Sequence, residues 1–322
     1  MTTWQEDVLG DPYEARKLTL APDFEGATQA TLVRRLVSSG VTQAKAVLHI
    51  HGFADYFFQT VAADFWVAHG YDFYAIDLRK YGRSLLAHQT PNFTNHLSAY
   101  YEELDLAWAE ISQDHSQIVV SGHSTGGLIA SLWLHDQRHD VDGVFLNSPW
   151  LDFQGDALTR QVKLPLVEQL GQYQPLHEVK RKTTGIYARS LHQDYFGEWN
   201  FNLNWKPIGS FKAYAGWIRT IRSGQRRIAN GLEINAPVLM ICSGRSGTPS
   251  DDQHPDADST DVVLDVEQMR RPIGCVSHQV TMHMIEGALH DVTLSRPEVR
   301  EQVFAELSGW LQRFVEHQSA DQ

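Results

Sequence analysis

Gly122-His123-Ser124-Thr125-Gly126-Gly127 lies near the middle of the chain, between an apolar run at 118–121 and apolar residues at helical spacing over 128–134. A serine flanked by glycines in this way, directly after a strand and directly before a helix, is presented on a sharp turn with its hydroxyl exposed. Glycine leaves room at such a turn where a Cβ would clash. The amide groups that open the following helix also point toward negative charge developing beside the serine. The stretch therefore predicts a nucleophilic Ser124 on a strand–turn–helix unit.

The surrounding chain repeats this alternation of strand and helix. Apolar runs with turn residues behind them predict strands at 46–50, 73–77, 144–146 and 238–241. The runs lack polar alternation, which is typical of parallel strands covered on both faces. Helical spacing recurs over 99–111 and 299–314, and two leading antiparallel strands fit the runs near 18–20 and 32–37. We expect an α/β fold with a doubly wound, mostly parallel sheet of about eight strands.

The alternation stops between about 150 and 231. This stretch is punctuated by Pro165, Pro175 and Pro207. Over 151–230 it carries 12 Lys and Arg against 6 Asp and Glu, although the whole chain has a net charge of -12. We predict an α/β core formed by 1–149 and 232–322, with a mainly helical cap inserted at 150–231.

Aromatic and basic residues crowd the second half of the predicted cap. Eight aromatic side chains fall within 195–217. They can form the small core of the cap itself, or close over an acyl chain. The arginines at 219, 222, 226 and 227 can form a solvated helix face or attract an anionic lipid surface. A lipid surface, contacted transiently, is therefore one possible partner of the protein.

Composition narrows the class of protein. The 322 residues include 27 Lys and Arg against 39 Asp and Glu, and so acidic a chain lacks the basic surface that nucleic-acid phosphates require. Cys242 and Cys275 are too few for a disulfide framework. Residues 1–10 lack the basic region and the apolar region that open a secretion signal. No apolar run reaches the ~18 residues of a membrane-spanning helix. We expect a cytoplasmic location, no nucleic-acid partner and no integral membrane segment.

Four motifs in a fixed order carry a family resemblance: His51-Gly52-Phe53, 77–84 (DLRKYGRS), 122–127 (GHSTGG) and 286–291 (EGALHD). They resemble the α/β-hydrolase family and, within it, the monoacylglycerol lipase and lysophospholipase-like branch of the serine aminopeptidase S33 type. The resemblance covers most of the chain. Two positions depart from the family pattern, because Lys80 stands where glycine is common and Ala54 stands where glycine or another small residue is usual.

The resemblance implies acyl-transfer chemistry and a role for each motif. Ser124 is the implied nucleophile, and His290 is the base that takes its proton and later gives it to the leaving alcohol. A carboxylate orients the imidazolium. The backbone N–H groups of Phe53 and Thr125 form the implied oxyanion hole.

His290 is favoured as the base among 16 histidines. It follows a strand-like run at 280–285, with Gly287 three residues before it, as the family places its base. The competitors lie in or beside predicted strands, or in the turn around the serine: His49, His51, His123, His278 and His283. An H-x-H pair can hold a metal on one face of a strand, but no further ligand spacing follows. We expect a structural role for this pair, and neither a metal nor another cofactor.

The acid of the triad has several candidates. In the family it follows the penultimate strand by a few residues, but here a polar loop at 246–260 intervenes. Asp261 has an apolar residue three positions further on, which resembles the family's junction between acid and helix, so we predict Asp261. Asp265 is expected one turn into that helix with a solvated side chain. Asp251 or Asp252 is the alternative, since a short loop there could also reach the histidine.

These residues lead us to expect a cofactor-free hydrolase of carboxylic esters, lipase-like or esterase-like. Its substrates would be small molecules: monoacylglycerols, lysophospholipids or short to medium acyl esters. An aminopeptidase or amidase with the same triad is the alternative enzyme, and it would need carboxylates to hold a substrate amine. A ligand-binding protein on a hydrolase scaffold is the alternative from another class. Dehalogenases and epoxide hydrolases carry Asp at the position of Ser124 and are disfavoured.

Overall fold

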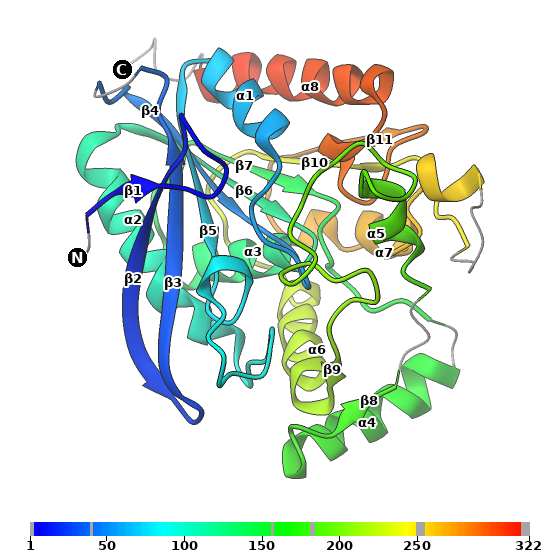
Figure 1. Ribbon diagram of the computed structural model, residues 1–322. Helices are drawn as coiled ribbons and strands as arrows, with labels where there is room; N and C mark the ends of the chain where they lie inside the picture. Colours follow the sequence, from blue (N-terminus) through cyan, green and yellow to red (C-terminus); the bar gives the residue numbers. More distant parts are fainter. Residues whose placement is uncertain (1–2, 39–40, 156–157, 181–183, 249–254, 317–322) are drawn as a thin grey trace.

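The centre of the molecule is a nine-stranded sheet in the order β1-β2-β3-β5-β4-β6-β7-β10-β11 (Figure 1). The computed structural model describes residues 3–38, 41–155, 158–180, 184–248 and 255–316. The strands of this sheet are β1 (Gln5–Glu6), β2 (Glu14–Asp23), β3 (Gly26–Arg35), β4 (Lys45–Ile50), β5 (Tyr71–Asp77), β6 (Gln117–His123), β7 (Gly143–Asn147), β10 (Val238–Ser243) and β11 (Val280–Ile285).

Strand direction divides the sheet into a short antiparallel part and a longer parallel one. β2 and β3 form an antiparallel pair, and β3 also runs antiparallel to β5. From β5 onward each neighbouring pair is parallel. The predicted doubly wound, mostly parallel sheet is confirmed. The additional strand is β1, a two-residue edge pairing with β2 that no apolar run indicated.

Helices cover both faces of the sheet (Figure 1). One face carries α1 (Thr60–Ala68) and α8 (Pro297–Leu311), and the other carries α2 (Tyr101–Asp114) and α3 (Thr125–Gln137). Successive residues of a buried strand point to opposite faces, so each strand supplies both apolar layers. Val47 of β4 belongs to the layer beneath α1 and α8, whereas Leu48 belongs to the layer beneath α2 and α3. Among the described residues, no helix has the length and apolar character needed to cross a membrane.

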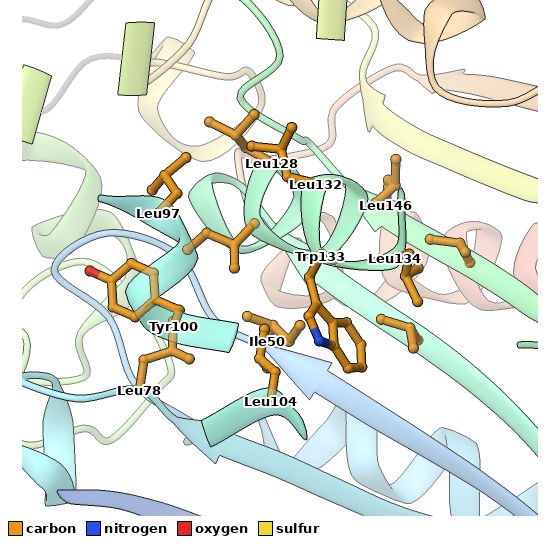
Figure 2. Packing of buried hydrophobic residues seen from close by; sticks show 14 of the residues in the cluster. Ile50, Leu78, Leu97, Tyr100, Leu104, Leu128, Leu132, Trp133, Leu134 and Leu146 are labelled. Carbon is orange, nitrogen blue, oxygen red and sulfur yellow. The ribbon is translucent and has the colours of Figure 1, made fainter. Parts of the chain in front are cut away.

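Helix α3 is the most deeply buried helix of the core. Its residues from Thr125 to Leu134 are all buried. Figure 2 shows Trp133 pointing from α3 toward Ile50 at the end of β4 and Leu104 of α2. The indole N–H of Trp133 donates to Asp105 at 2.8 Å. At the other end of α3, which Ser124 precedes, Gly126 lies close against the carbonyl oxygen of Ile50 at the end of β4.

Between β7 and β10 the described chain adds no strand to the large sheet. We call this stretch the inserted segment; it contains α4 (Leu164–Tyr173), α5 (Ile186–Leu191), α6 (Ala215–Ala229) and the short pair β8 (Glu178–Val179) and β9 (Ala213–Tyr214). α6 packs on α3, where a Cβ on Gly224 would stand 2.9 Å from Leu132. α4 packs in turn on α6 (Figure 1). The division into core and cap at 150 and 231 stays a prediction.

The aromatic side chains of the inserted segment have several environments. Phe201 is buried in a small apolar cluster beside Phe58, with Trp199 and Trp205 packed against it. Tyr195 and Phe196 are exposed. Three of the four arginines form ion pairs: Arg222 with Asp152, Arg226 with Glu168 and Arg227 with Asp136. Many of these contacts reach residues outside the inserted segment, such as Phe58 and Asp136, so they fasten the segment to the rest of the chain.

Candidate active site

Ser124 stands on the tight turn between β6 and α3. Its backbone has φ 53° and ψ -117°, a conformation that residues other than glycine adopt only when their surroundings enforce it. A Cβ on Gly122 would stand 2.8 Å from the carbonyl oxygen of Gly126, and a Cβ on Gly126 would collide with the carbonyl oxygen of Ile50. The turn therefore requires glycine at both positions, and it holds the serine side chain at the end of the sheet.

Three of the predicted site residues meet at this turn from distant parts of the chain. Ser124 Oγ lies 3.0 Å from His290 Nε2, and His290 Nδ1 lies 2.7 Å from Asp261 Oδ2. A carboxylate can only accept, so Nδ1 carries the ring proton and Nε2 accepts from the serine hydroxyl. His290 and Asp261 are 3% and 1% exposed, so this hydrogen-bond chain is shielded from bulk water.

Asp261 is held in place through its second oxygen. Oδ1 accepts the N–H groups of Val263 at 2.8 Å and Leu264 at 2.7 Å, which leaves Oδ2 to His290. Asp265 differs from its prediction, because it caps α7 (Val266–Arg270) and accepts the N–H of Glu267 at 3.0 Å instead of lying inside the helix. The alternatives Asp251 and Asp252 lie outside the described residues.

The turn His51-Gly52-Phe53 lies directly beside the serine. A Cβ on Gly52 would stand 3.0 Å from Ser124 Cβ. Phe53 and Thr125 both line the cavity into which Ser124 opens. Ala54, the next residue, has φ 50°, a conformation that glycine adopts without strain. The backbone N–H groups of Phe53 and Thr125 as oxyanion donors stay a prediction.

The cavity beside Ser124 has a volume of about 350 Å³. Both the inserted segment and the rest of the chain supply its walls, and apolar side chains form most of them: Phe53, Trp150, Ile186, Ile208, Trp217, Val262, Val263 and Leu264. The rings of Phe53 and Trp217 pack with centroids 4.2 Å apart. Asp55 and Lys206 add a buried pair of opposite charges to the wall. The space suits a small, largely apolar molecule.

The two histidines of the H-x-H pair bond to neighbouring parts of the fold. His51 Nε2 accepts the N–H of Leu78 at 3.1 Å, so its proton lies on Nδ1, which donates to the carbonyl oxygen of Gly52 at 2.8 Å. His51 thereby braces the turn beside the serine. His49 lies in β4, with Nδ1 3.2 Å from Ser121 Oγ, and burial lowers its pKa from 6.5 to about 4.

We expect the buried, neutral His49 to make the protein less stable in mild acid. In the unfolded chain its pKa is about 6.5, so protons bind the unfolded state first as the pH falls from 6.5 toward 4. The free energy of unfolding should drop by about 2 kcal/mol between pH 7 and pH 5 on this account alone. His49→Asn should lose less stability over that interval than the wild type in urea melts, whereas His88→Asn, at an exposed site, should match it. Identical losses in all three proteins would contradict a neutral His49.

The stretch 77–84 secures the loops around the site. Asp77 accepts the N–H groups of Phe57 and Arg83, each at 2.9 Å. Arg79 forms a buried ion pair with Glu103 at 2.5 Å. Lys80 adopts φ 66°, which accounts for glycine at this position elsewhere in the family, and its ammonium pairs with Asp23 and Glu25.

Sequence reasoning missed five polar residues around the triad, four buried and one, Tyr187, half-buried: Asp55, Gln59, Tyr187, Lys206 and Asp291. Asp291 is the last residue of the motif at 286–291, and Asp55 lies two residues after the motif His51-Gly52-Phe53. Burial acts to raise the pKa of Asp291, but His123 and the hydrogen bonds from Thr293 and Asn147 hold it below its ordinary value. For these two acids, the available sequence signal was their position within or beside a motif.

The parallel sheet, the strained serine turn and the contact of serine, histidine and aspartate define an α/β hydrolase. The sequence model described as Serine aminopeptidase, S33, matches residues 42–296. The chain belongs to this family, so the resemblance carried by the four motifs is confirmed. No curated protein matches the chain.

Solved structures share the fold at low sequence identity. A soluble variant of monoglyceride lipase from Saccharomyces cerevisiae, in complex with a substrate analogue, has a TM-score of 0.63 and 14% identity, over 92% of this chain and 95% of that chain. Monoacylglycerol lipase from Paleococcus ferrophilus has a TM-score of 0.60 and 16% identity, over 92% and 98%. Est1E from Butyrivibrio proteoclasticus, with bound ferulic acid, has a TM-score of 0.56 and 12% identity, over 98% and 100%.

Proposed function

We propose that the protein is a serine hydrolase that cleaves carboxylic esters of small molecules through an acyl-enzyme on Ser124. The observation that carries the proposal is the continuous hydrogen-bond chain from Asp261 through His290 to Ser124, which ends at the wall of an apolar cavity. A serine hydroxyl becomes a strong nucleophile when an oriented histidine can take its proton.

The reaction follows from these contacts in two half-reactions. Ser124 Oγ attacks the ester carbonyl carbon while its proton passes to His290 Nε2, and Asp261 stabilises the imidazolium through Nδ1. The N–H groups of Phe53 and Thr125 receive the negative charge on the carbonyl oxygen, at about 3 kcal/mol for each donor. The C–O bond breaks, and His290 returns the proton to the leaving alcohol. Water then attacks the acyl-enzyme by the same route and releases the acid.

The cavity supports an apolar acyl group of short to medium length. Its walls from the inserted segment include Ile186, Ile208 and Trp217, which agrees with a cap that closes over the substrate. Monoacylglycerols and lysophospholipids combine such an acyl group with a polar alcohol. The similar monoglyceride and monoacylglycerol lipases are named for esters of this kind, which supports an ester substrate.

The aminopeptidase alternative meets an obstacle in the cavity. A substrate amine needs a carboxylate partner, and among the described residues that line the cavity the one carboxylate besides the triad is Asp55. Asp55 already pairs with Lys206 at 2.9 Å. No observation favours amide hydrolysis over ester hydrolysis.

The proposal is tested with p-nitrophenyl esters of graded acyl length and a fluorophosphonate probe. We expect steady turnover with a preference for one range of acyl lengths, and labelling of a single tryptic peptide that contains Ser124. Labelling should disappear in urea-unfolded protein, because activation depends on the folded contact with His290. A folded sample that neither turns over any ester nor reacts with the probe would contradict the proposal and favour a ligand-binding protein.

A further inference from the structure

A buried ion pair joins the inserted segment to the turn beside Ser124. Lys206 Nζ donates to Asp55 Oδ1 at 2.9 Å, and the two residues are 7% and 2% exposed. Burial acts to raise the pKa of Asp55, but the ammonium of Lys206 together with His123 and His51 lowers the pKa to about 2. Asp55 is two residues beyond Phe53, so the pair anchors the turn that carries the predicted oxyanion donor.

Gln59 connects this pair to the loop of the catalytic histidine. Its side-chain Nε2 lies 3.4 Å from Asp55 Oδ2 and 3.2 Å from Asp291 Oδ2. Because both neighbours are carboxylates, the amide must direct its N–H groups at them. Asp291 follows His290 in the chain, and its other carboxylate oxygen, Oδ1, accepts a hydrogen bond from Asn147 Nδ2 at 2.7 Å.

A second contact returns to the inserted segment. Tyr187 of α5 accepts the backbone N–H of Asp291 on its phenol oxygen at 3.0 Å, and its ring meets His290 edge to face with centroids 5.7 Å apart. Lys206, Asp55, Gln59, Asp291 and Tyr187 thus form a chain that begins and ends in the inserted segment. We call these five residues the polar circuit.

The geometry points to a positioning role: we propose that the polar circuit fixes the turn His51-Gly52-Phe53 and the loop of His290 relative to each other. Hydrolysis would then depend on the inserted segment being packed against the rest of the chain. The inference rests on the proposed function. Its physical basis is that the relative placement of two elements of a catalytic site must be accurate to a fraction of an ångström, because an error of 1 Å costs about 100-fold in rate. Ala54 at φ 50° lies between the anchored Asp55 and Phe53, so the turn needs such an anchor.

The test separates positioning from stability with one single and one double variant. Lys206→Met removes the ammonium and leaves Asp55 as an unpaired buried charge, so both the melting temperature and kcat should fall, kcat by about 100-fold. Lys206→Met with Asp55→Asn removes both charges, so the melting temperature should recover while kcat stays low. Lys212→Met, which breaks an exposed pair with Glu178 in the same segment, should match the wild type.

Tyr187→Phe keeps the ring against His290 and removes the oxygen that holds Asp291. It should lower kcat by about fivefold with little change in KM, since one hydrogen bond is lost. The rate of fluorophosphonate labelling should fall in parallel in each variant whose kcat falls.

Recovery of wild-type kcat in the folded double variant would overturn the positioning role and leave the ion pair as a stabilising contact. A wild type without turnover or labelling would instead overturn the proposed function, and this inference with it. The double variant keeps the test decisive if Lys206→Met alone fails to fold.

Discussion

Ser124→Ala is expected to lower kcat for ester hydrolysis by about 10⁶-fold, the loss seen when a member of an interdependent triad is removed. Without Oγ no acyl-enzyme forms, and the remaining rate comes from binding and the oxyanion donors. The hydroxyl makes its one described side-chain contact with His290, so its removal should leave the melting temperature nearly unchanged. Hydrolysis of p-nitrophenyl esters and fluorophosphonate labelling measure the effect.

Ser148→Ala is the matched control for this variant. Ser148 is also a fully buried serine with positive φ, 45°, and it follows the adjacent strand β7. Its hydroxyl has no hydrogen-bond partner among the described residues, so its loss should leave kcat unchanged. Equal activity of Ser124→Ala and Ser148→Ala would remove Ser124 from the reaction.

The sheet could be predicted because its strands are short apolar runs with turn residues behind them. Leu48 and Val47 of β4 face different helical layers, and burial on both sides removes the polar alternation that would have obscured the strand. Helix α1 was missed. Its nine residues from Thr60 to Ala68 are almost all apolar, so no helical period separates a buried face from a solvent face.

The triad could be predicted for a different reason. Ser124 and His290 each sit in a local motif whose glycines are required by the turn, as the close approach of Gly126 to Ile50 shows. Three members of the polar circuit, Gln59, Tyr187 and Lys206, have no such local signal. Gln59 and Asp291 are separated by 232 positions, and Asp55 and Lys206 by 151. Only the folded chain brings these side chains together.

Asp265 shows how a single N-cap residue can move the start of a helix, here α7, along the chain. Its distance from Asp261 suggested a place one turn into the helix. The chain instead stays extended at Asp265, with φ -84° and ψ 115°, because its carboxylate accepts the N–H of Glu267 and begins the helix at Val266. The N–H groups of Val263 and Leu264, which precede the helix, both bond to Asp261.

That arrangement makes Asp261→Asn a specific test of the triad acid. Asparagine can keep its oxygen toward the N–H groups of Val263 and Leu264, and its NH₂ then faces His290 Nδ1 in place of Oδ2. The ring must accept this N–H at Nδ1, so its proton moves to Nε2 and it can no longer accept from Ser124. We expect kcat to fall by about 10⁴-fold with the fold intact, as the wrong tautomer costs in comparable triads.

Asp265→Asn is the matched control, because it removes a nearby carboxylate charge and retains an oxygen that can cap α7. It should leave kcat at the wild-type level. Near-normal turnover in Asp261→Asn would transfer the orienting role to another carboxylate, and Asp251→Asn and Asp252→Asn would then identify it. A fall of four orders of magnitude in Asp261→Asn alone would mean that the buried carboxylate 2.7 Å from His290 Nδ1 keeps the base in the tautomer that ester hydrolysis requires.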